Sequence, residues 1–207
     1  MNFTPLPKNF FLRDTLTVAK DLLGKTIVRK SGRKFLTGKI VETEAYIGEH
    51  DTASHAYGRI TPRNETLYME GGICYVYFIY GNYYCFNTVT GKEGEGSGVL
   101  IRAIEPLSGI EKMHLNRGPV KKVHDLTNGP GKLCMALNID KSLNRTIITE
   151  VNNKVFMAKP QKPEKLDIAV SKRIGIDGSN HAHLPYRFFI KDNPYVTRHK
   201  LNKQSIQ

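Results

Sequence analysis

Two glutamates close together in the chain could take part in acid–base chemistry. Glu42 and Glu44 lie in the run Val41-Glu-Thr-Glu-Ala-Tyr46. If this run is a β-strand, alternate residues share a face, so Glu42, Glu44 and Tyr46 point to the same side. A carboxylate beside an aromatic ring can activate a water molecule next to a bound flat group. Taken alone, however, the run is more typical of a solvated acidic strand face.

An aromatic segment, Ile73–Asn87, consists almost entirely of residues that favour β-strands. We expect it to form a β-hairpin with its turn at Tyr80-Gly81-Asn82. Tyrosines on strands are usually half-buried packing residues, and this is the first interpretation for Tyr75, Tyr83 and Tyr84.

Tyr80 calls for a different interpretation, because a large aromatic side chain at a hairpin tip cannot be buried in its own sheet. On a basic protein, such a residue could wedge between base pairs or stack on a base. Tyr77 would share a strand face with Tyr75.

Three further polar residues could complete a site. His55 lies in a loop, where it could face a ligand held between Tyr46 and Tyr77, although a lone loop histidine is commonly just solvated. Asn87 could supply an amide that reads a base edge. Arg102 lies in the apolar run Val99–Ile104. A buried arginine needs a carboxylate partner, and Glu44 is the obvious one, whether in a catalytic or in a purely structural ion pair.

The composition indicates an anionic partner. The chain has 207 residues and a net charge of +12, which suggests a nucleic acid, because a cationic surface attracts phosphates and releases their counterions. The three cysteines are widely spaced and form no Cys-x-x-Cys pair, which argues against disulfides and a zinc site and favours a reducing cytoplasm. No signal pattern and no membrane-spanning apolar run is apparent. We therefore expect a cytoplasmic protein with no cofactor and no metal.

The elements that must position these residues mix helices with hairpin strands. The sequence predicts a helix over Asp14–Gly24, strands over Thr26–Arg29 and Leu36–Tyr46, a long functional connection over 47–72, and a flexible loop over 90–98. Further strands are expected at Val99–Ile104, within Val155–Pro163 before a proline-bearing loop, within Lys165–Ile176 and at Tyr186–Lys191, with a helix over Lys132–Ala136.

These elements predict one α+β domain over residues 1–207, with an antiparallel curved β-sheet, a protruding β-hairpin and surrounding helices. Residues 1–8 are expected to form an N-terminal arm, and residues 198–207 a basic polar tail.

Several of these motifs, in this order, resemble the alkyladenine (3-methyladenine) DNA glycosylases, in particular a short bacterial type. The motifs are Glu42–Gly48, His55, Thr61-Pro-Arg-Asn64, Tyr75–Gly81, Asn87 and Arg102–Pro106, extended by Gly129–Cys134 and Arg173-Ile-Gly175. The resemblance runs from about residue 8 to about residue 197.

The resemblance implies a role for each matching residue. Glu44 would deprotonate the attacking water, and Arg102 would help to hold that water and the glutamate. Tyr46, His55 and Tyr77 would surround the flipped base, and Asn87 would crowd the 2-amino group of guanine. Tyr80 would fill the gap left in the duplex, with a DNA-contacting surface that also includes Asn82, Tyr83, Arg59 and Thr61.

The implied activity is that of a monofunctional glycosylase. It would flip alkylated or deaminated purines (3-methyladenine, 7-methylguanine, hypoxanthine or ethenoadenine) out of double-stranded DNA and hydrolyse the N-glycosidic bond, as a monomer and without lyase activity. Two alternatives stay open: a non-catalytic nucleic-acid-binding module of the same fold, and an RNA-acting hydrolase. Gly131, at the expected pocket wall, and the polar Asn82 beside the wedge leave the substrate range open.

Overall fold

Strand β2 (Lys34–Tyr46) organises the fold, because it pairs with three other strands in the computed structural model, which describes residues 2–79 and 81–204. Strand β5 (Ser97–Ser108) runs along one edge. On the other edge, β1 (Thr26–Ser31) pairs with the first half of β2, and β8 (Arg187–Ile190) pairs with Glu42–Glu44. Irregular register between Ile40 and Thr43 coincides with this change of partner.

The remaining strands extend the sheet in antiparallel fashion. The order along the sheet is β3-β4-β5-β2-β1-β6, and β7 pairs with β8. Strands β3 (Cys74–Ile79) and β4 (Tyr83–Thr90) form the hairpin that the sequence predicts. Gly81, at its turn, has a φ of +70°, which favours glycine. Strands β6 (Val155–Ala158) and β7 (Ile168–Ser171) are short.

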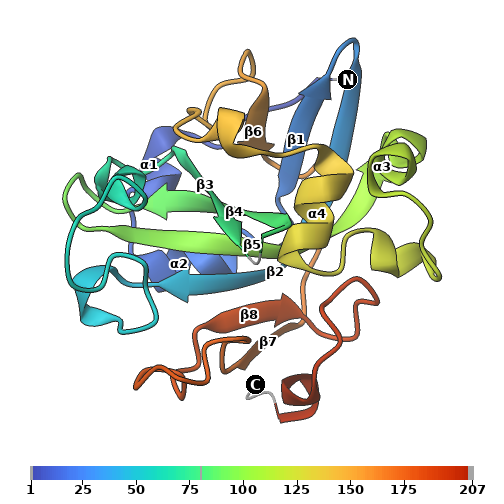
Figure 1. Cartoon of the computed structure of the whole chain (residues 1–207). Coiled ribbons are helices and arrows are strands. Elements are labelled where there is room, and N and C mark those ends of the chain that lie inside the picture. Colours follow the sequence, from blue (N-terminus) through green and yellow to red (C-terminus); the bar gives the residue numbers. More distant parts are fainter. Residues whose placement is uncertain (1, 80, 205–207) are drawn as a thin grey trace.

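Within the described residues, four α-helices surround the sheet (Figure 1): α1 (Lys8–Phe11), α2 (Thr15–Asp21), α3 (Ile110–Arg117) and α4 (Pro130–Leu137). Helix α2 confirms the helix predicted after Asp14, whose carboxylate accepts the Thr17 amide as an N-cap. Helix α4 also matches its prediction and begins with a proline at its first turn. Helix α3 was not predicted, because it is mostly polar and buries only Met113.

Short 3-10 helices occupy several connections: Gly48–His50, Glu65–Tyr68, Val123–Leu126, Lys141–Leu143 and Lys200–Gln204. Two of them lie in the long connection between β2 and β3. The first residues of the chain, expected as an arm, lie along β6, where the Leu6 amide donates to the Met157 carbonyl and the Leu6 side chain is buried.

The hydrophobic core lies between the curled sheet and its helices. Its largest cluster joins side chains of α1, α2 and α4 to those of β1, β2, β4 and β5. Thr43 donates its hydroxyl to the Ala19 carbonyl of α2, so this face of β2 is turned towards the helix and the opposite face carries Glu42 and Glu44. The predicted α+β class, with a curved antiparallel sheet, a hairpin and surrounding helices, is confirmed.

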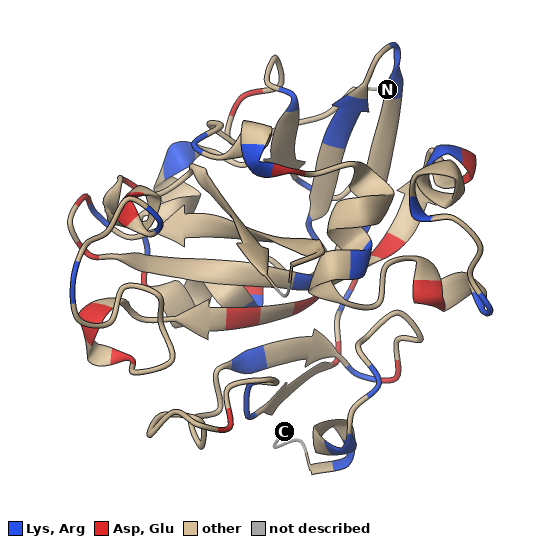
Figure 2. Ribbon diagram, in the orientation of Figure 1, with Lys and Arg blue, Asp and Glu red and all other residues tan. Residues whose placement is uncertain are grey.

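The positive charge is spread over many elements rather than gathered on one. Figure 2 shows Lys and Arg on β1, α1, α4, β8 and the C-terminal segment, with acidic residues in β2 and in the loop after it. Within the described residues, no helix is long and apolar enough to cross a membrane.

Candidate active site

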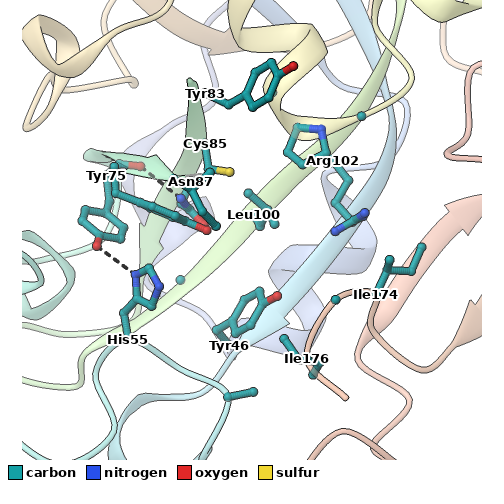
Figure 3. A pocket seen from close by; sticks show the side chains of 18 of the residues that line it. Tyr46, His55, Tyr75, Tyr83, Cys85, Asn87, Leu100, Arg102, Ile174 and Ile176 are labelled. Atoms are coloured by element: carbon teal, nitrogen blue, oxygen red, sulfur yellow. Dashed lines mark hydrogen bonds between the residues drawn. The ribbon is translucent and has the colours of Figure 1, made fainter. Parts of the chain in front are cut away.

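A cavity of about 500 Å³ opens beside the hairpin and over β2 and β5 (Figure 3). A volume in this range suits a small flat molecule such as a nucleobase. The opposite wall is formed by the N-terminal end of α4 and by residues 174–176, far apart in the sequence. The residues that line it include Tyr46, His55, Tyr75, Tyr77, Tyr83, Cys85, Asn87, Leu100, Arg102, Arg117, Lys132, Ile174 and Ile176.

Glu44 lies behind one wall of this cavity and is fully buried. Its Oε2 accepts from the Tyr46 hydroxyl at 2.9 Å and from Arg102 Nη1 at 3.1 Å. Its Oε1 accepts from the backbone N–H of Ile174 at 2.7 Å. All three donor residues line the cavity. The interpretation of this strand face as solvated is therefore wrong, and the expected ion pair between Glu44 and Arg102 is present.

Glu42, two residues earlier, is also fully buried but bonds to different partners. Its Oε1 accepts from Arg102 Nε at 3.0 Å and from Arg187 Nε at 2.7 Å, and its Oε2 accepts from the Thr197 amide. Burial alone would raise the pKa of Glu42, but Arg102, Arg187 and the Thr197 hydrogen bonds together hold it below its usual value. Two carboxylates thus meet two guanidinium groups, and the charges of this buried cluster balance.

Tyr46 forms one aromatic wall of the cavity. Burial and then the nearby Glu44 charge raise its pKa well above the usual value, so the hydroxyl stays protonated and donates to Glu44. The guanidinium of the buried Arg173 lies over the Tyr46 ring, 4.7 Å from its centre. Arg173 also binds both carboxylate oxygens of Asp51, which anchors the loop after β2.

Tyr75, Tyr77 and His55 form the second aromatic wall. The Tyr75 and Tyr77 ring centres are 5.3 Å apart, and the His55 ring stands edge-on to Tyr77 at 4.5 Å. His55 Nδ1 lies 3.0 Å from the Tyr75 hydroxyl (Figure 3). His55 is exposed towards solvent, but the surrounding side chains displace part of its hydration. This loss of hydration, followed by the positive charge of Arg63, lowers the pKa of His55 to about 4, so the ring is neutral at pH 7.

Asn87 lies on β4 between these walls, opposite Tyr75 in the hairpin. Its Nδ2 donates to the Tyr75 carbonyl at 3.2 Å, which fixes the orientation of the amide. The structure therefore brings together six of the residues that the sequence singled out: Glu44, Arg102, Tyr46, His55, Tyr77 and Asn87.

The residues expected to contact DNA lie at the rim or beside it. Tyr83 lines the cavity and is 41% exposed, and Asn82 is exposed at the hairpin turn. Arg59 is exposed and Thr61 half-buried in the loop before β3, and neither lines the cavity. Tyr80, the expected wedge, lies outside the described residues.

Asn64 ties this loop together. Its side-chain amide donates to the carbonyls of His55 and Arg59 and accepts from the Thr61 N–H.

Several cavity residues were missed by sequence reasoning. Cys85 lies beside the Tyr77 hydroxyl, and burial raises the pKa of its thiol. Arg117 and Lys132 add positive charge to the wall formed by α3 and α4. Ile174 supplies the backbone donor to Glu44, and a backbone N–H leaves no signal in the sequence. All three cysteines are free and buried.

Comparison with known proteins places these residues in a family. The model of the family described as "Methylpurine-DNA glycosylase (MPG)" matches residues 9–194. A Clostridium botulinum protein is 50% identical over 202 residues, which cover 93% of this chain and 98% of that protein. A Legionella pneumophila protein is 43% identical over 194 residues with the same coverage of each chain. The names of both relatives assign them provisionally as 3-methyladenine DNA glycosylases.

Proposed function

We propose that this chain, which belongs to the methylpurine-DNA glycosylase family, hydrolyses the N-glycosidic bond of damaged purines in double-stranded DNA. The observation that carries this proposal is the position of Glu44. It lies behind a nucleobase-sized cavity, and its three hydrogen-bond donors all line that cavity.

Glu44 acts as the general base in this proposal. An ionised carboxylate offers about four acceptor positions, and the described residues occupy three of those on Glu44, so one is left for a water molecule. The water oxygen attacks C1′ of the sugar while Glu44 takes a proton from it. The bond between C1′ and the purine nitrogen breaks, and its electron pair leaves with the base.

Arg102 serves as a positioning residue for this step. It bonds Glu44 and Glu42 at once and therefore fixes the carboxylate relative to the cavity. The sugar gains positive charge as the bond breaks. The nearby carboxylate of Glu44 stabilises this charge.

The damaged base would occupy the cavity between Tyr46 on one side and Tyr77 with His55 on the other. Reaching it requires that the base leave the DNA stack, at a cost of a few kcal/mol. We propose that Tyr80 offsets part of this cost as a wedge in the duplex. Asn82, Tyr83, Arg59 and Thr61 would contact the DNA around it, and Asn87 would exclude the 2-amino group of normal guanine.

We propose that the enzyme releases the base without cutting the strand. Glu44 stands behind the cavity wall, whereas the amine of Lys132, which also lines the cavity, donates to Asn128 Oδ1 at 2.6 Å and lies 3.6 Å from Asp125 Oδ1. Alkylated and deaminated purines are the expected substrates, and a cationic purine is the better leaving group. A DNA substrate implies action where the chromosome lies, in the cytoplasm of a bacterium. We propose that the enzyme acts as a monomer.

The substitution Glu44→Gln tests the proposal. We expect the rate of base release from a duplex with one lesion to fall by a factor of about 10² to 10⁴, as for the loss of a general base. Affinity for the lesion duplex should persist. Release is measured by alkaline cleavage at the abasic site, and affinity by a gel-shift titration.

A matched control is Glu111→Gln, which removes an exposed carboxylate from α3 and should leave release unchanged. Full release by the Glu44→Gln protein would reject the mechanism. Release from RNA but not from DNA would favour the RNA-acting alternative. Binding without release by the wild-type protein would favour the non-catalytic one.

A further inference from the structure

Both aromatic walls of the cavity have an arginine against a ring face. The guanidinium carbon of Arg173 lies 4.7 Å from the centre of the Tyr46 ring, and that of Arg63 lies 5.9 Å from the centre of the Tyr77 ring. Both tyrosines line the cavity, whereas neither arginine does. Neither guanidinium would therefore contact a base in the cavity directly, and each lies over a ring that would.

The two arginines differ in how their charge is compensated. Arg173 is fully buried and paired with both oxygens of Asp51. Arg63 is exposed, and none of the ion pairs within residues 2–79 and 81–204 includes it. Of the two aromatic walls, only the Tyr77 wall therefore carries a positive charge that no carboxylate of the described residues neutralises.

We propose that Arg63 is a specificity-determining residue that weakens the preference of the cavity for positively charged purines over neutral ones. This inference rests on the proposed function. An aromatic ring attracts a cation through the negative charge density of its faces. Arg63 already interacts with the charge density of the Tyr77 ring, and its positive charge repels a cationic purine bound against the same ring. A neutral purine is not repelled, so its affinity for the cavity does not depend on the charge of Arg63.

Distance and exposure set the size of the effect. A base in van der Waals contact with Tyr77, at about 3.5 Å, would lie roughly 9 Å from the guanidinium. This distance is comparable with the Debye length of about 8 Å at physiological salt, so the charge is felt but is partly screened. We therefore expect Arg63 to change the relative affinity for cationic and neutral purines by about three-fold, near the lower end of measured cation–π contributions.

The consequence would be a cavity that accepts both classes of damaged purine. Without Arg63, the attraction between the aromatic rings and a positively charged base would dominate recognition. With Arg63 in place, stacking area and shape contribute a larger share of the affinity, so neutral damaged purines can compete with cationic ones for the cavity. His55 fits the same pattern, because Arg63 helps to keep this ring neutral and so avoids a further charge at the wall.

The test compares affinities for two duplexes, one with a single cationic 7-methylguanine and one with a single neutral hypoxanthine. All proteins carry Glu44→Gln, so that binding is measured without base release. Adding Arg63→Gln should raise the ratio of the 7-methylguanine affinity to the hypoxanthine affinity about three-fold. Arg63→Lys, which keeps the charge, should leave the ratio close to that of the parent.

Arg33→Gln is the matched control, because it removes one positive charge from the exposed turn between β1 and β2. It should weaken both affinities together. An unchanged ratio in Arg63→Gln, an equal rise in Arg33→Gln, or equal affinity of every variant for lesion and undamaged duplexes would overturn the inference. Because the measurement reads binding alone, failure of the wild-type protein to release any base would overturn only the proposed function.

Discussion

Glu42 and Glu44 occupy the same strand and the same face, both are fully buried, and both bond to Arg102, yet their surroundings differ. The other partners of Glu42 are Arg187 and Thr197, which do not line the cavity. The other partners of Glu44 are Tyr46 and Ile174, which do. Glu42 is thus enclosed by β8 and the C-terminal segment, and Glu44 stands directly behind the cavity wall.

The difference teaches that residue type and strand face do not separate a structural carboxylate from a candidate catalytic one. Each carboxylate accepts three hydrogen bonds, so the number of hydrogen bonds does not distinguish them either. What separates them is where their partners lie. Glu42 ties β2 to β8 and the C-terminal segment, whereas Glu44 ties β2 to residues that would touch a bound base.

The largest expected effect concerns the stability of the two regions. Glu42→Gln should lower the free energy of unfolding by about 3–5 kcal/mol, because it leaves Arg187 buried without its carboxylate. Glu44→Gln should cost only about 1–2 kcal/mol, because Arg102 keeps Glu42 and the amide oxygen can still accept hydrogen bonds. Urea unfolding followed by circular dichroism measures both. Equal losses, or a larger loss for Glu44→Gln, would break the proposed division of roles.

A smaller effect should come from Tyr46→Phe, which removes one donor to Glu44 and keeps the ring. We expect base release to slow by about ten-fold, equivalent to about 1.4 kcal/mol, with little change in affinity for lesion DNA. Single-turnover rates and gel-shift titrations measure the two quantities. The matched control is Tyr75→Phe, which deletes a hydroxyl that bonds His55 rather than Glu44. An equal slowing of release in this control would show that the hydroxyl on Glu44 has no special role.

The smallest expected effect is a change in acid stability. The pKa of Glu42 is lowered in the folded protein, so its contribution is present above the ordinary value of 4.5 and is lost as the pH falls through the folded value. Stability should therefore decline below about pH 4.5, and Glu42→Gln should make this decline shallower.

Part of the dependence of the unfolding free energy on pH should remain in Glu42→Gln, because the pKa of Asp51 is also lowered in the folded protein. Unfolding free energies from urea titrations at several acidic pH values test this. A slope that is the same in Glu42→Gln as in the wild type would contradict the prediction.

The sequence by itself determined the local elements and the face on which each side chain lies. Alternation along β2 placed Glu44 beside Tyr46, and the turn residues around Gly81 predicted the hairpin. The rule that a buried arginine needs a carboxylate predicts the pairing of Arg102 with Glu44 from the sequence alone. These inferences held because they depend on short-range periodicity or on the cost of burying a charge.

Only the tertiary structure decided which distant segments meet at those side chains. The donor from Ile174, the second guanidinium from Arg187 and the arginines behind Tyr46 and Tyr77 come from parts of the chain far from their partners. Periodicity fixes the face on which a side chain lies but not the distant segment that packs against it, because that segment is determined by how the sheet curls. For this reason the sequence identified Glu44 as a candidate base, whereas the fold decided that Glu42 would be its structural counterpart.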